Sequence, residues 1–180
     1  MSQTISSTKP LSIEKGSVGE ERLTTWFQRN RLGFIPVSQS PLTFPSIFTG
    51  RIKRPDFLVI LESMGMLAVD AKNYACSNEC FTLNLEELRR ALAFEWYTRL
   101  PFWFAYLQEE EQGEVWYWIS AMRALNSGEV RVNGRTGDQF GVIPKRLFVQ
   151  IEKIGDLGHL INQTQRLHNI TLTPNLIHQP

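Results

Sequence analysis

Two short apolar runs separated by a polar break form the clearest pattern in the chain. Residues 57–61 and 66–71 are almost wholly apolar, and the polar break between them spans residues 62–65. Short apolar runs joined by a few turn-forming residues are typical of a hairpin of buried β-strands. The sequence therefore predicts such a hairpin in the first half of the chain.

Helical spacing of apolar residues marks two further segments. A rough helical stripe predicts a helix over residues 17–32. Asn84 and Glu87 are spaced like a capping box and predict a helix start, with the helix running over residues 85–99. Pro101 cannot continue that helix.

The remaining segments complete an α/β pattern. In chain order we expect a strand at 34–37, a long loop at 38–54, strands at 102–107 and 115–119 joined by an acidic turn at 108–113, a loop at 127–141, a strand at 147–151 and a short helix at 157–167. The main elements then follow the order helix, three strands, helix, two strands. We expect one domain over residues 16–154, a flexible segment at 1–15 and a tail at 155–180.

The composition is that of a single globular domain and does not indicate a particular binding partner. A chain of 180 residues with 42% hydrophobic content can bury one sizeable core. The net charge of +1 gives no global signal for a polyanion, so affinity for DNA would have to come from local patches. Cys76 and Cys80 are too few for a disulfide framework or a structural zinc site, which favours a reducing, cytoplasmic compartment. Neither a signal peptide nor a membrane span is expected.

The predicted hairpin carries the candidate chemistry. Side chains alternate along a strand, so Asp70 and Lys72 lie on one face and Ala71 on the other. An antiparallel register that pairs Asp56 with Asp70 or Lys72 brings all three polar groups to that face. Two close carboxylates repel each other and invite a cation, and Mg²⁺ prefers such oxygen ligands. The alternative is structural: Asp56 ends a strand and pairs with Lys72 in a salt bridge.

The same residues resemble the signature of the PD-(D/E)xK nuclease superfamily. Pro55-Asp56 is similar to its first half and Asp70-Ala71-Lys72 to its second, and residues 16–20 resemble a first-helix glutamate motif. The helix and strand pair at 85–120 are similar to those of Holliday-junction-resolvase-like members. The resemblance spans residues 16–120 and implies a restriction-endonuclease-like αβββαβ core with a central mixed sheet flanked by helices. The sequence beyond residue 120 matches no subfamily pattern.

The resemblance also implies roles for individual residues. Asp56 and Asp70 would bind the metal, the Ala71 carbonyl would be a further ligand, and Lys72 would be the catalytic lysine. Glu20 would be an accessory metal ligand. Ser17 and Glu20 also have the spacing of a capping box, in which the glutamate serves only the helix start.

Two basic groups are candidates for contact with DNA phosphates. The first precedes the hairpin and consists of Arg51, Lys53 and Arg54. The second is interleaved with glycines and consists of Arg131, Arg135, Lys145 and Arg146. The alternative for both is a solvated cluster of surface charges. Four aromatic residues, Trp103, Trp116, Tyr117 and Trp118, lie in predicted strands, where packing is favoured over stacking on bases.

From these features the sequence predicts a Mg²⁺-dependent DNA endonuclease, with Mn²⁺ able to substitute. The alternative is a catalytically silent module of the same fold that binds DNA or assembles within a mobile-element, repair or defence complex. A third possibility is a structural partner subunit with an exposed apolar interface. The expected partners are DNA and either a second copy of the chain or another protein of a DNA-processing complex.

Overall fold

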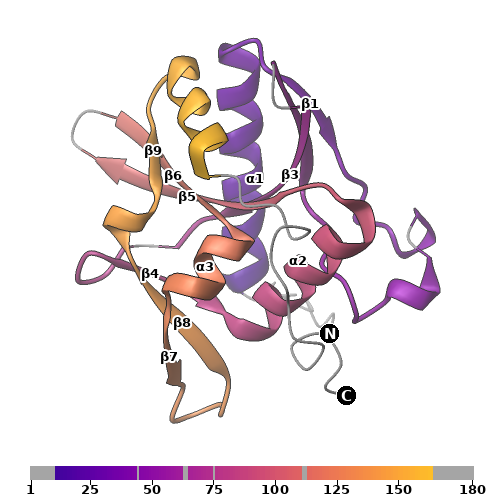
Figure 1. The fold of residues 1–180 in the computed structure, drawn as a ribbon, viewed down its shortest axis with the longest axis vertical. Coiled ribbons are helices and arrows are strands. Elements are labelled where there is room, and N and C mark those ends of the chain that lie inside the picture. Colours follow the sequence, from indigo (N-terminus) through magenta and orange to yellow (C-terminus); the bar gives the residue numbers. More distant parts are fainter. Residues whose placement is uncertain (1–10, 44, 63–64, 75, 111–112, 164–180) are drawn as a thin grey trace, which may run out of the picture.

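A mixed six-stranded sheet forms the centre of the protein (Figure 1). The computed structural model describes residues 11–43, 45–62, 65–74, 76–110 and 113–163. The strands of the central sheet follow the order β1-β2-β3-β5-β6-β9. Their bounds are β1 (Gly33–Pro36), β2 (Phe57–Leu61), β3 (Gly65–Lys72), β5 (Phe102–Glu110), β6 (Gly113–Ser120) and β9 (Val149–Ile151).

The central sheet has the predicted αβββαβ order. The hairpin of β2 and β3 is antiparallel, and β3 pairs in parallel with β5 after the chain has passed through helix α2 (Leu85–Thr98). All other pairings in this sheet are antiparallel. The predicted fold, a mixed sheet flanked by helices in an α/β domain, is therefore confirmed.

Each face of the central sheet is covered by its own set of elements. Helix α1 (Leu11–Arg29) covers one face with Leu23, Trp26 and Phe27, together with the 3-10 segment η4 (Ile154–Gln163). The other face packs against α2, against α3 (Ala121–Ser127) and against a second, three-stranded sheet. Successive side chains along one strand point to opposite faces of the sheet and therefore pack in different hydrophobic cores.

Helix α1 begins earlier than the sequence pattern indicates. The predicted start was residue 17, whereas the helix begins at Leu11. Glu20 therefore lies well inside the helix, where the backbone N–H groups already have intrahelical partners. The capping role considered for Ser17 and Glu20 is wrong.

Helix α2 begins where the sequence predicts. The side chain of Asn84 accepts hydrogen bonds from the backbone N–H groups of Glu86 and Glu87, at 2.8 and 3.1 Å. Arg99 ends the helix in the left-handed conformation, with φ of 63°, two residues before Pro101. Only half of the predicted capping box is present, because the Glu87 carboxylate points to other partners described below.

The second sheet and α3 were not predicted. The second sheet consists of β4 (Cys80–Asn84), β8 (Gln139–Pro144) and β7 (Glu129–Val132) in that order, and the hairpin of β7 and β8 extends away from the central sheet (Figure 1). The loop predicted at residues 127–141 is therefore wrong. All four residues of β7 are exposed, so this strand lacks the alternation that marks half-buried strands.

Other segments differ in detail. The acidic turn predicted at 108–113 is shorter, because β5 continues to Glu110 and β6 starts at Gly113. The long loop at 38–54 contains two short 3-10 turns, η1 (Pro41–Thr43) and η2 (Ser46–Phe48). The helix predicted at 157–167 overlaps η4, whose Leu157 and Leu160 belong to the core, and residues 164–167 of that prediction lie outside the described residues.

The aromatic strands form the core, as predicted. Trp103, Trp116 and Trp118 are completely buried and pack on the α1 side of the sheet, while Tyr117 is 4% exposed on the opposite side. None of these four side chains is placed to stack on a nucleic-acid base.

Glu95 is a buried carboxylate outside the candidate site. It lies on α2, is 5% exposed and accepts a hydrogen bond from the backbone N–H of Phe102 at 3.4 Å. Burial raises the pKa of Glu95 from 4.5 to about 8, and the Phe102 hydrogen bond offsets only part of that rise. Folding therefore favours the protonated form of Glu95.

Glu95→Gln is expected to reduce the pH dependence of stability. Between about pH 5 and 8 the folded wild type keeps a proton that the unfolded chain has lost, so its stability falls as pH rises. The slope from this group approaches about 1.4 kcal/mol per pH unit. Both proteins are unfolded with urea at about pH 5 and pH 8. From the lower to the higher pH, the free energy of unfolding of the variant should rise relative to that of the wild type. Glu86→Gln changes an exposed position on the same helix and should show no such rise. An equal rise in both variants would contradict the assignment to Glu95.

Within the described residues, no helix is both long and apolar enough to cross a membrane.

Candidate active site

Asp56 lies immediately before β2, beside the C-terminal end of β3. Its backbone N–H donates to the Val69 carbonyl at 2.9 Å, and its Oδ2 accepts the backbone N–H of Ala71 at 2.8 Å. The hairpin register pairs Phe57 with Val69, so the ladder continued by one residue sets Asp56 against Asp70. This is one of the two registers that the sequence pattern requires for a shared site.

Asp70 and Lys72 lie on the face of β3 that is covered by α2. Their carboxylate and ammonium groups form an ion pair, with Lys72 Nζ 2.8 Å from Asp70 Oδ2. Both side chains are almost fully buried, at 3% and 9% exposure. Phe104 on β5 is the neighbour of Asp70 in the sheet, and the Lys72 Nζ lies 5.7 Å from the centroid of its ring.

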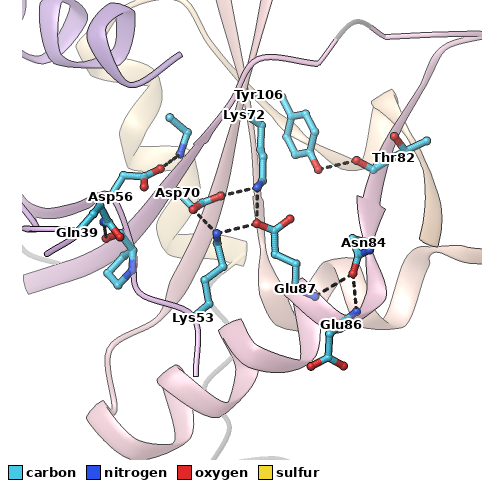
Figure 2. A network of polar contacts seen from close by, with 12 residues as sticks. Gln39, Lys53, Asp56, Asp70, Lys72, Thr82, Asn84, Glu86, Glu87 and Tyr106 are labelled. Atoms are coloured by element: carbon cyan, nitrogen blue, oxygen red, sulfur yellow. Dashed lines mark hydrogen bonds and ion pairs between the residues drawn. The ribbon is translucent and has the colours of Figure 1, made fainter. Parts of the chain in front are cut away.

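Two residues from other elements complete a network of four charges (Figure 2). Lys53 Nζ lies 2.7 Å from Asp70 Oδ1 and 2.6 Å from Glu87 Oε1, and Lys72 Nζ lies 2.5 Å from the same Glu87 oxygen. Lys53 is held beside α2 because its backbone N–H donates to the Arg90 carbonyl. Lys72 thus pairs with Asp70 and Glu87, not with Asp56 as the structural alternative supposed.

The charges of this network stabilise one another. Burial acts to lower the pKa of Lys72, but Asp70 and Glu87 outweigh burial and raise it above its ordinary value. Burial acts to raise the pKa of Glu87, yet Lys72 and Lys53 bring it down to about 2. Both groups are therefore charged at neutral pH. Lys72 is a hydrogen-bond donor and a fixed positive charge rather than a proton acceptor.

Asp56 is in the opposite electrostatic situation. Burial and the neighbouring charge of Asp70 together raise the pKa of Asp56 to about 8, and the hydrogen bond from Ala71 offsets only part of the rise. Glu20 adds to this repulsion. Asp56 is therefore mostly protonated at neutral pH in the metal-free protein, and a cation bound beside it would favour its charged form.

Glu20 reaches the same region from α1. Burial and the charge of Asp70 both raise the pKa of Glu20, which places its carboxylate within electrostatic reach of Asp70. The preceding residue, Gly19, allows this approach: a Cβ there would lie 3.2 Å from the Cβ of Asn73 and 3.7 Å from the carbonyl carbon of Lys72. A side chain at position 19 would require Asn73 or the helix to shift by a few tenths of an ångström.

The three residues of the first basic group have different surroundings. Lys53 belongs to the charge network, and Arg54 donates to the carbonyls of Ser38 and Ser40, at 2.6 and 2.8 Å, so that it holds the adjoining loop. Arg51 is exposed. Contact of these residues with DNA stays a prediction.

The second basic group lies on the second sheet and its flank. Arg131 and Arg135 are exposed on the β7–β8 hairpin, and Arg131 pairs with Glu129 at 3.2 Å. In η3 (Lys145–Leu147), the Lys145 ammonium lies over the Tyr117 ring at 4.5 Å from the centroid, while Arg146 is exposed. Their contact with DNA likewise stays a prediction.

Comparisons with known proteins found likeness at the level of solved structures. No protein-family model matches the sequence, and no curated protein sequence matches it significantly. A Holliday junction resolvase from Archaeoglobus fulgidus superposes with a TM-score of 0.47 and 15% identity, over 81% of this chain and 96% of the resolvase. A nuclease from a fusselovirus gives a TM-score of 0.43 and 14% identity, over 86% and 93%. Because both identities are low, the chemistry of the site is inferred below from its own residues.

The sequence pattern missed two members of the network. Glu87 was interpreted as half of a capping box, although its spacing from Asn84 is equally compatible with a carboxylate on the first turn that faces a neighbouring strand. The charged neighbours of Lys53 predict either a contact with DNA phosphates or a solvated surface cluster, and neither interpretation makes it a partner of Asp70.

Proposed function

We propose that the protein is a metal-dependent DNA endonuclease that hydrolyses phosphodiester bonds. The observation that carries this proposal is the convergence of Asp56, Asp70 and Lys72 at the C-terminal end of β3, with the Glu20 carboxylate nearby. Carboxylates and a fixed lysine at one strand end suit a reaction in which negative charge develops on phosphate oxygens.

The donor atoms fit a hard divalent cation. Asp56 and Asp70 would hold it, with the Ala71 carbonyl and Glu20 as further oxygen ligands. Within the described residues, no group of three or more acidic, histidine or cysteine side chains is placed to hold a metal ion. Mg²⁺ commonly takes one or two protein carboxylates and completes its coordination with waters and substrate phosphate, and Mn²⁺ accepts similar ligands. When bound, such a cation would activate water and offset charge on the phosphate.

The chain's own residues would orient the reaction. Lys72 is held between Asp70 and Glu87 and keeps a third ammonium proton for a phosphate oxygen or an attacking water. Glu87 fixes the direction of that ammonium, so we assign Glu87 a positioning role. Asp56 is fixed by the Ala71 N–H, which leaves its second oxygen, Oδ1, for a ligand.

The basic groups would bind the DNA backbone around this site. Arg51, Lys53 and Arg54 belong to the segment that leads into Asp56, close to the proposed point of cleavage. Lys145 and Arg146 would contact the duplex farther from it. Such contacts would fix the position of the DNA without reading its sequence.

The decisive experiment incubates the purified chain with four-way junction, flap, linear duplex and single-stranded DNA. Each substrate is tested with Mg²⁺, with Mn²⁺ and with excess chelator. We expect cleavage of at least one substrate that depends on the cation. Paired cuts across a junction would indicate a dimer. The absence of cleavage on every substrate with both cations would contradict the proposal.

One observation favours a second candidate, a silent module of the same fold that binds DNA. Both oxygens of the Asp70 carboxylate already face ammonium groups, at 2.7 and 2.8 Å, and thus have cationic partners without a metal. Such a module would bind DNA without cleaving it and would show no Mn²⁺ binding that depends on Asp56 and Asp70. Calorimetric titration with Mn²⁺ separates the two candidates.

A further inference from the structure

Lys53 and Lys72 approach the Asp70 carboxylate from two sides (Figure 2). Each ammonium takes one oxygen: Lys53 lies 2.7 Å from Oδ1 and Lys72 lies 2.8 Å from Oδ2. A divalent cation that uses Asp70 as a ligand needs at least one of these oxygens. One of the two lysines must therefore yield its place.

The two lysines differ in their freedom to move. Lys72 is part of β3, its side chain is 9% exposed, and its ammonium lies above the Phe104 ring. Lys53 belongs to the segment before β2 and is nearly twice as exposed, at 17%. Its flexible four-carbon stem allows the ammonium to swing without a backbone shift. Lys53 is the lysine that can leave Asp70.

Glu87 would keep Lys53 close after it leaves. Lys53 Nζ lies 2.6 Å from Glu87 Oε1, so the ammonium can lose Asp70 and retain one carboxylate partner. The network also balances its charge, because the two lysines match Asp70 and Glu87. A divalent cation on Asp70 would repel both ammonium groups, and the more exposed Lys53 can move away from the cation while it keeps Glu87 as a partner.

We propose that Lys53 is an internal counter-cation of the metal site, which holds Asp70 in the metal-free protein and gives up its place to the entering divalent cation. This inference rests on the proposed metal site. It assigns Lys53 a function in metal exchange that differs from its predicted contact with DNA. The ammonium that leaves Asp70 stays beside the site, where a substrate phosphate can meet it.

Metal affinity in the absence of DNA tests this exchange. Lys53→Met keeps the length of the side chain and removes the competing charge. We expect it to bind Mn²⁺ between about tenfold and a thousandfold more tightly than the wild type in isothermal titration calorimetry, as expected for removal of one charge a few Å from the cation. Mn²⁺ should also raise the melting temperature of this variant more than that of the wild type.

Two further variants complete the experiment. Lys53→Arg keeps the charge and can bind a carboxylate with two hydrogen bonds, so we expect weaker Mn²⁺ binding than in the wild type. The weaker Mn²⁺ binding by Lys53→Arg can still be measured if Lys53→Met does not fold. Arg89→Met removes the same charge from the exposed face of α2, where Arg89 contacts Glu86, and should leave the affinity unchanged.

The outcomes separate the two proposals. Unchanged or weaker Mn²⁺ binding by Lys53→Met, with normal binding by the wild type, would overturn the exchange role and leave the nuclease proposal standing. Tighter binding by Lys53→Arg would also overturn it. If no variant and no wild-type sample binds Mn²⁺, the metal site itself is refuted and the exchange role with it.

Discussion

Asp70→Asn is expected to abolish metal-dependent DNA cleavage while the chain keeps its fold. Asparagine has nearly the shape of aspartate but no negative charge, so the site loses a proposed metal ligand and the ion pairs to both lysines. We expect the cleavage rate to fall by at least about 10²- to 10³-fold, the scale of losing one principal electrostatic contact to a transition state. Initial rates with Mg²⁺ on the best-cleaved DNA measure this loss.

A matched control separates loss of chemistry from loss of structure. Asp138 is exposed on the β7–β8 hairpin, and Asp138→Asn makes the same chemical change far along the chain from the proposed ligands. It should cleave at the wild-type rate. Circular dichroism should show the same secondary structure for all three proteins. Cleavage by Asp70→Asn at the wild-type rate would refute the assignment of Asp70 as a metal ligand.

Lys72→Met is expected to lower both activity and stability. The variant removes a buried cation, so Asp70 and Glu87 must share Lys53 as their remaining ammonium partner. Loss of one partner from a buried ion pair costs about 3 to 5 kcal/mol, and the retained Lys53 contacts favour the lower end of that range. Without the Lys72 ammonium, cleavage should fall by about 10²- to 10³-fold.

Urea denaturation and cleavage rates measure the two effects separately. Lys153→Met, at an exposed position, should change stability by less than about 0.5 kcal/mol and leave the rate unchanged. A Lys72→Met protein that loses stability but still cleaves normally would reduce Lys72 to a structural ion-pair partner. Full stability together with lost cleavage would mean that Lys53 compensates the two acids completely.

The fold was predictable where local chemistry and local structure agree. The β2–β3 hairpin follows from two apolar runs and a short break, and the start of α2 follows from the side chain of Asn84. Both features depend on interactions between residues that lie close together in the sequence. The β7–β8 hairpin and the seven-residue α3 carry no such signal, because β7 is exposed on both faces and α3 is too short to show a full apolar stripe.

The site was predictable only in part, for the same reason. Asp56, Asp70 and Lys72 share one hairpin, so strand alternation alone brings them together. Glu87 and Lys53 reach them through tertiary packing of α2 and of the segment before β2, which no local pattern records. The capping interpretation of Glu20 was wrong because the helix extends six residues upstream of the position where its pattern becomes visible.

The close contact between α1 and the end of β3 gives Gly19 an importance that its chemistry does not suggest. Its missing side chain sets the gap between the helix and Asn73, and the next residue along the helix is Glu20. A side chain at this position would require Asn73 or the helix to shift by a few tenths of an ångström, and a shift of the helix would change the distance between the Glu20 carboxylate and the two aspartates. The geometry of the acidic side of the site therefore depends on a position that can neither ligate a metal nor transfer a proton.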